Sequence, residues 1–140
     1  SAYEPSDAQI SWHLARFVEM VRGLPSDPIV VRQNWLRAYD WATQGGAQAL
    51  NAMAEADDPF AKVGKTTIAV EVLSVVRASP TSFNVRWRES TYMSGTLTHV
   101  ERYSGVATIV IEPPSSPERL SKNPLGLYVH SLTWSRDLQQ

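Results

Sequence analysis

The side chains that could carry out acid–base or metal chemistry are few and scattered. The three histidines are His13, His99 and His130, and none has a second ligand type at helical i, i+4 spacing, so the sequence predicts no zinc site. There is no Gly-x-Ser-x-Gly nucleophile motif. The absence of cysteine excludes thiolate nucleophiles and disulfides. We therefore predict no catalytic residue, no metal and no cofactor.

Two features of the sequence offer alternatives to a protein without catalytic or ligand-binding residues. Residues 63–67 read Val-Gly-Lys-Thr-Thr, like the end of a phosphate-binding loop, but the position of the first required glycine is Pro59. The segment also precedes a predicted strand instead of a helix, so we interpret it as a helix-to-strand connection. The second alternative is a small-ligand binder or enzyme, in which Asp40, His99 or His130 would have to meet in one pocket.

The overall composition limits the class of protein. A chain of 140 residues is long enough for one domain with a single core. Its formal net charge of -1 argues against nucleic-acid binding, which needs a basic surface. The apolar runs are far shorter than the roughly 20 residues that span a bilayer.

The first half of the chain has helical patterns. One apolar stripe comprises Ile10, Leu14, Phe17, Val18 and Val21, after a cap at Ser6 or Asp7 and before Gly23. A second helix begins at Pro28, after Asp27, and is predicted to stop near Gly45-Gly46. A third covers residues 47–56, and residues 57–59 open one more turn.

The second half has strand patterns. Strands are predicted over residues 67–78, 82–92, 96–112 and 127–138, with a bend or bulge near Gly105 and a short turn at 118–121. Helices followed by an antiparallel meander predict an α+β domain, with helices packed on one face of a curved four-stranded sheet.

The best-defined turn comprises Asn123, Pro124, Leu125 and Gly126. Asparagine can accept a backbone hydrogen bond, proline sets φ at the second position, and glycine suits the fourth. The following strand alternates with period two, with Leu127, Val129, Ser131, Thr133 and Ser135 on one face and Tyr128, His130, Leu132, Trp134 and Arg136 on the other.

Two surface features suggest binding. Trp12 lies opposite the apolar stripe of the first helix, near Arg16, and is either covered by a loop or available to a partner. Arg86, Arg88, Arg102 and Glu101 would form cross-strand ion pairs on a solvated sheet face, with a partner-binding surface as the alternative.

Several segments together resemble a known family. They are residues 32–40 (RQNWLRAYD), 58–61 (DPFA), 70–79 (VEVLSVVRAS), 83–87 (FNVRW) and the closing NPLGLYV and WSRDL. In this order they resemble the conjugal-transfer members of the VirB-type inner-membrane assembly proteins of type IV secretion systems.

The resemblance implies an NTF2-like fold and a non-enzymatic role in plasmid transfer. It implies that residues 1–140 form a single periplasmic C-terminal domain, with a transmembrane helix and a cytoplasmic tail upstream of this chain as its only membrane attachment. Weak self-association and contacts with other channel subunits are the expected interactions. The expected interaction residues are Asn123, Pro124, Leu125 and Gly126, the family's Asn-Pro-x-Gly motif, together with Trp12 and Arg16.

Overall fold

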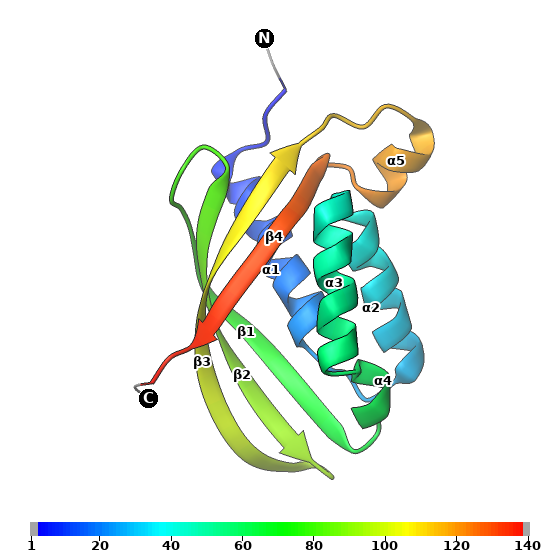
Figure 1. Ribbon diagram of the computed structural model, residues 1–140, viewed down its shortest axis with the longest axis vertical. Helices are drawn as coiled ribbons and strands as arrows, with labels where there is room; N and C mark the ends of the chain where they lie inside the picture. The colour runs from blue at the N-terminus through cyan, green and yellow to red at the C-terminus, as the bar shows by residue number, and fades with distance from the viewer. Residues whose placement is uncertain (1–2, 139–140) are drawn as a thin grey trace.

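The first four helices precede the strands, as the sequence predicts, and a fifth, short helix lies between the last two strands, where the sequence predicts only a turn. The computed structural model describes residues 3–138. The helices are α1 (Asp7–Arg22), α2 (Pro28–Asp40), α3 (Gln44–Ala56), α4 (Pro59–Lys62) and α5 (Pro117–Lys122). The strands are β1 (Thr66–Arg77), β2 (Ser82–Met93), β3 (Thr96–Ile111) and β4 (Leu127–Arg136). They form one antiparallel sheet of order β1-β2-β3-β4, and α1, α2 and α3 lie on one side of it (Figure 1).

The predicted starts of the first two helices are confirmed by their caps, whereas the helix predicted from residue 47 begins at Gln44. Ser6 and Gln9 form a capping box, in which the Gln9 amide donates to the Ser6 hydroxyl oxygen and the Ser6 amide donates to Gln9 Oε1. Asp27 accepts from the amide of Ile29, with Pro28 at the first helical position. Residues 63–65 connect α4 to β1, as predicted. No helix in the described part of the chain is long and apolar enough to cross a membrane.

The predicted end of the second helix was wrong. Helix α2 ends at Asp40, and α3 begins at Gln44 after the cap Thr43, so Gly45 and Gly46 lie in its first turn. A Cβ on Gly46 would stand 2.2 Å from the carbonyl oxygen of Val129. These glycines therefore allow α3 to approach β4 closely, instead of ending a helix.

The alternation predicted for β4 holds only in its first half. The pairing of β3 with β4 shifts register between Thr108 and Ile109, and His130 is the extra residue on β4. Leu132 and Trp134 therefore pack against the core, on the same side as Leu127 and Val129. The sequence predicts a bend or a bulge near Gly105, and of these two the bulge is absent, since β3 keeps its register there with both neighbours.

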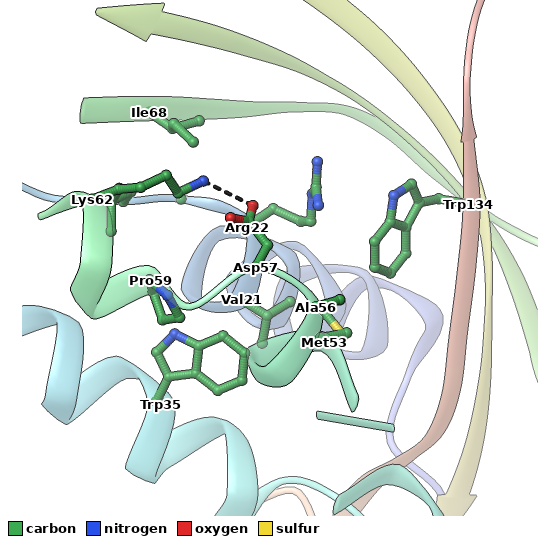
Figure 2. Close-up of a pocket in the computed structure, with 12 residues that line it drawn as sticks. Val21, Arg22, Trp35, Met53, Ala56, Asp57, Pro59, Lys62, Ile68 and Trp134 are labelled. Carbon is green, nitrogen blue, oxygen red and sulfur yellow. Dashed lines mark hydrogen bonds and ion pairs between the residues drawn. The ribbon is translucent and has the colours of Figure 1, made fainter. Parts of the chain in front are cut away.

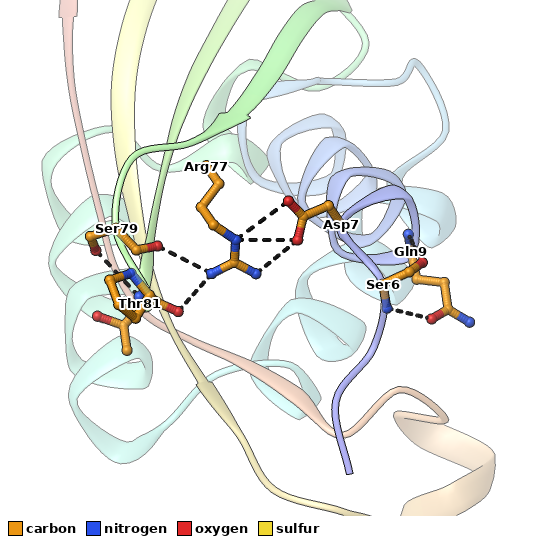
Figure 3. A network of polar contacts seen from close by, with 7 residues as sticks. Ser6, Asp7, Gln9, Arg77, Ser79 and Thr81 are labelled. Carbon is orange, nitrogen blue, oxygen red and sulfur yellow. Dashed lines mark hydrogen bonds and ion pairs between the residues drawn. The ribbon is translucent and has the colours of Figure 1, made fainter. Parts of the chain in front are cut away.

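The core lies between the helices and the concave side of the sheet. All five predicted apolar residues of α1 are buried, as are Phe83, Val85 and Trp87 of β2. An exposed polar network also joins the end of β1 to the start of α1 (Figure 3). There Arg77 Nη2 lies 2.9 Å from Asp7 Oδ1, and the hydrogen bond with Arg77 is the main cause that lowers the pKa of Asp7.

Candidate interaction site

The predicted Asn123–Gly126 turn is present, and its asparagine is buried. The Gly126 amide donates to the Asn123 carbonyl oxygen at 3.0 Å, which closes the predicted four-residue turn. Asn123 is fully buried. Its Nδ2 donates to the Leu127 carbonyl at 2.9 Å, and its Oδ1 accepts from the Leu127 amide at 3.3 Å. The side chain therefore bonds to the first residue of β4, not to the turn residue two positions on.

Position 126 requires glycine because of both its backbone conformation and the atoms around it. Its φ is +62°, and a Cβ there would stand 2.2 Å from the Glu112 carbonyl oxygen. The Glu112 amide donates to the Gly126 carbonyl at 2.7 Å. The turn is thus held against the segment that leaves β3, and only Pro124 is well exposed, with Leu125 half-buried.

Three aromatic residues connect this turn to the helices. Trp41, at the end of α2, donates its Nε1–H to the Lys122 carbonyl at 2.8 Å. His13 of α1 stacks on Trp41 with ring centroids 3.7 Å apart. Tyr3 donates its hydroxyl to the Leu125 carbonyl at 2.9 Å. The backbone of the turn is therefore held by contacts with the N-terminal segment and with Trp41 at the end of α2, which in turn packs on α1.

His13 is the most unusual titratable group near the turn. It is 1% exposed, and its Nε2 has no hydrogen-bond partner among the described residues. Burial lowers its pKa from 6.5 to about 4, while a backbone hydrogen bond at Leu127 acts in the opposite direction. His13 is therefore neutral at physiological pH and serves as a flat ring in the core.

Trp12 is exposed to solvent and is not covered by a loop. It is 61% exposed on α1, although His13 and Leu14 beside it are buried. Arg16, one turn further on, forms an ion pair with Glu19 at 2.6 Å. The turn and the Trp12–Arg16 pair are separate features of the structure, since no hydrogen bond or ion pair among the described residues joins them.

The residues required for an acid–base site do not meet. A pocket of about 220 Å³ lies between the C-terminal part of α1, the helices α2 to α4, and strands β1 and β4 (Figure 2). Its charged lining residues are Arg22, Asp57 and Lys62, and Lys62 pairs with Asp57 at 2.8 Å. Asp40, His99 and His130 are absent from its lining. His130 instead bonds to Thr43, and His99 lies 3.2 Å from Glu101.

Sequence reasoning missed a buried ion pair beside this pocket. Arg22 donates to both carboxylate oxygens of Glu89, at 2.6 and 2.9 Å, and the Trp87 indole donates to the same carboxylate at 2.8 Å. The Arg22 guanidinium also lies over the rings of Tyr103 and Trp134. The alternation Phe83, Val85, Trp87, Glu89 could have indicated that Glu89 faces the core.

The predicted row of charges on the sheet is only partly correct. Arg88 pairs with Glu71 of the neighbouring strand, which is a cross-strand pair of the predicted kind. Glu101, however, faces the other side of the sheet, where it pairs with Arg136 at 2.7 Å. Its neighbour Arg102 has the opposite orientation, because successive residues of a strand point to opposite faces.

Comparison with known proteins identifies the family. A family model described as VirB8 protein matches residues 1–137. The conjugal transfer protein TrbF of Rhizobium radiobacter is 30% identical over 128 residues, which make up 89% of this chain and 58% of TrbF. The chain thus spans a little more than half of that relative.

Solved structures share the fold. Agrobacterium tumefaciens VirB8 matches with a TM-score of 0.83 at 13% identity, over 99% of both chains. A TrwG component of the type IV secretion system from Bartonella birtlesii matches with a TM-score of 0.80 at 19% identity, over 100% of this chain and 97% of that one. The predicted NTF2-like fold, with helices on a curved antiparallel sheet, is confirmed. The family match and the identity to TrbF show that this chain belongs to the VirB8 family of type IV secretion proteins.

Proposed function

We propose that the chain is the periplasmic domain of a non-enzymatic assembly component of a conjugative type IV secretion system. In this proposal a transmembrane helix upstream of residues 1–140 anchors it in the inner membrane, and the domain joins channel subunits during plasmid transfer. Membership of the VirB8 family and the 30% identity to a conjugal transfer protein support the role.

The observation that carries the proposal is the exposed Trp12. A tryptophan that is 61% exposed on a helix whose other aromatic residues, His13 and Phe17, are buried has no role in the core. Tryptophan and arginine are enriched in binding hot spots. Trp12 and Arg16 therefore form the proposed contact for weak self-association.

In this proposal the four residues of the Asn-Pro-x-Gly turn have two different roles. Asn123 and Gly126 hold the backbone in place, and Pro124 and Leu125 are the side chains offered to another subunit. This division follows from burial, because a contact with a partner requires exposed atoms, and Asn123 has none.

Sedimentation equilibrium tests self-association. We expect weak dimerisation of the wild-type domain, and a clear loss of it in Trp12→Ala. The matched control is Phe60→Ala, which removes another exposed aromatic side chain from α4 (47% exposed) and should leave association unchanged. A wild-type domain that stays monomeric at millimolar concentration, or equal association of Trp12→Ala and wild type, contradicts the proposal.

Plasmid transfer tests the function in cells. Pro124→Ala and Trp12→Ala, introduced into the full-length protein, should reduce transfer strongly at unchanged protein level, whereas Phe60→Ala should not. Substitution of Asn123 or Gly126 is less informative here, because both residues support the fold. Wild-type transfer from the Pro124 and Trp12 variants would contradict an assembly role for these residues.

The pocket of about 220 Å³ favours small-ligand binding as a second candidate function. TraE, which shares the fold at 16% identity, is described in complex with a pyridine carboxylic acid. The pocket here combines the aromatic residues Trp35 and Trp134 with the basic side chains of Arg22 and Lys62 (Figure 2). These basic groups are paired with Glu89 and Asp57. Titration with 2-chloroisonicotinic acid should shift the indole NMR signals of both tryptophans, and unchanged signals would exclude this ligand class.

A further inference from the structure

Strand β3 continues beyond the end of β4, so part of it has a neighbouring strand on one side only. Its register with β2 runs along residues 96–108, whereas its register with β4 begins only at Tyr103. Figure 1 shows β4 ending partway along β3. Residues 96–100 are all exposed. The described part of the chain thus leaves a free sheet edge at residues 97–101, in line with the end of β4.

Val100 turns its backbone amide and carbonyl toward this free edge. Further along β3, the Ile109 amide donates to the Thr81 carbonyl, on the β2 side. In an antiparallel pair, residues that bond to the neighbour alternate with residues that do not. The register is unbroken from Thr108 to His99, so Glu101 bonds to β2 and Val100 does not.

Leu97 also turns its backbone groups to the free edge. On β1, Ile68 exchanges both backbone hydrogen bonds with Leu24, so its neighbour Thr67 is the residue that bonds to Tyr92 of β2. Leu97 stands opposite Tyr92 and therefore has no partner on β2. No turn, loop or side chain in residues 3–138 bonds to the backbone of Leu97 instead.

The side chains of Leu97 and Val100 share the convex face of the sheet. Trp87 of β2 faces the core, so Ser90 and Tyr92 face the other way, because successive residues of a strand alternate. Val100 is opposite Ser90 and Leu97 is opposite Tyr92. Leu97 is 50% exposed and Val100 is 39% exposed. Aliphatic residues of an added strand would therefore find cross-strand partners here.

The other face beside the free edge is polar and its charges are compensated. A hollow of about 530 Å³ lies at the corner where β4 ends, and Glu101 and Arg136 are among its lining residues. Glu101 lies 3.2 Å from His99 and 2.7 Å from Arg136. An added strand thus needs neutral polar residues on this face and aliphatic residues on the convex face.

We propose that an extended segment of a partner protein pairs with β3 at residues 97–101, antiparallel to it, with aliphatic residues placed against Leu97 and Val100. In such strand addition, main-chain hydrogen bonds provide affinity and alternate side chains provide specificity. The proposal specifies one subunit contact of the assembly function proposed above and so rests on it. Its test needs only this chain and a peptide.

A second copy of the chain fits this edge less well than a free segment. In a two-fold pairing of β3 centred on Val100, each strand extends equally past the axis and needs room beside Arg102. That room is taken, because the Arg102 carbonyl already accepts from the Asp137 amide at 2.8 Å. A free segment can end beside Asp137.

Hydrogen exchange measured by NMR tests the proposal. In the chain alone, the amides of Leu97 and Val100 should exchange faster than those of Glu101 and Tyr103, which bond to β2. The probe is the peptide Lys-Thr-Val-Thr-Val-Thr-Lys, which should slow exchange at Leu97 and Val100. A residue that exchanges hydrogen bonds with its opposite residue lies on the same face. N-methylation of both peptide valines should therefore abolish binding, and N-methylation of the flanking threonines should not.

Substitutions locate the contact on β3. Val100→Pro removes an outward amide, which an edge strand tolerates, and should weaken binding at least about fivefold. Val100→Ala keeps this amide and should weaken binding less. The matched control is Val106→Ala, which truncates a valine of similar exposure (41%) on the same face of β3, where β4 covers the edge. Its affinity should equal that of wild type.

Several results would overturn the proposal. They are no binding of the unmodified peptide, equal binding of the two methylated peptides, and an equal loss in Val106→Ala. Reduced self-association of Val100→Pro in sedimentation would assign the edge to a second copy. Peptide binding that appears only after removal of residues 139–140 would assign it to the chain's own end. Circular dichroism of each variant excludes misfolding. Absent peptide binding leaves Trp12-dependent association intact, so the two proposals fail separately.

Discussion

At the residue scale, Gly126 is the residue of the turn that tolerates substitution least. Gly126→Ala combines strain at φ +62° with a Cβ placed 2.2 Å from the Glu112 carbonyl oxygen, and backbone atoms cannot move away cheaply. We expect a loss of about 2–4 kcal/mol in the free energy of unfolding, measured by urea denaturation.

Gly64 provides the matched control for this prediction. It also has positive φ, at +91°, but a Cβ there would meet nothing within 4 Å. Gly64→Ala therefore isolates the conformational cost, about 1–2 kcal/mol. Equal losses in the two variants would show that the contact with Glu112 carries no energy.

His13 gives the fold a dependence on pH. Its pKa is about 4 in the folded state and 6.5 ordinarily, so between these values the unfolded chain binds more protons. The free energy of unfolding should therefore fall as pH decreases from 6.5 to 4, by about 3 kcal/mol from this residue. His13→Phe keeps a ring against Trp41 and should flatten this part of the profile. An unchanged slope in His13→Phe would refute the assignment.

At the element scale, the Arg22–Glu89 pair joins the end of α1 to β2. Glu89 is 5% exposed, and Glu89→Gln leaves the Arg22 guanidinium without its carboxylate between two aromatic rings. Breaking a buried pair in this way costs about 3–5 kcal/mol. Glu71→Gln removes the exposed partner of Arg88 and should cost at most about 1 kcal/mol. Thermal unfolding of both variants measures the difference, and a similar small loss in both would contradict a stabilising role for the buried pair.

The elements also show how far the sequence predicts the structure. Caps and apolar periodicity located α1, the start of α2 and all four strands, because these patterns act over a few neighbouring residues. The errors at Gly45-Gly46 and in the alternation of β4 have a different origin. Position 46 requires glycine because a side chain there would clash with the Val129 carbonyl of β4. The bulge at His130 appears only in the register of β3 with β4. Contacts between distant segments leave no local pattern.

The same limit applies to the proposed interaction residues. Turn chemistry predicted the Asn123–Gly126 turn but not the burial of Asn123. The turn is held by Trp41, which bonds to Lys122, and by Glu112, which bonds to Gly126, and both come from other parts of the chain. Helical geometry correctly placed Trp12 outside the core, because that inference needs only the angle between successive residues.

At the scale of the whole molecule, two of the proposed contacts lie on different elements. Trp12 belongs to α1, and Pro124 and Leu125 lie in the turn between α5 and β4. In the proposal, the domain binds a second copy through one contact and another subunit through the other. This arrangement suits an assembly component if one contact does not block the other.

Independence of the two contacts can be measured. Effects of distant residues without shared partners usually add within about 0.5 kcal/mol. Self-association, measured by sedimentation equilibrium, should therefore be the same in Pro124→Ala and wild type, although Pro124→Ala reduces plasmid transfer. A loss of self-association in Pro124→Ala would instead mean that the turn belongs to the self-association surface, and the two contacts would then form one coupled site.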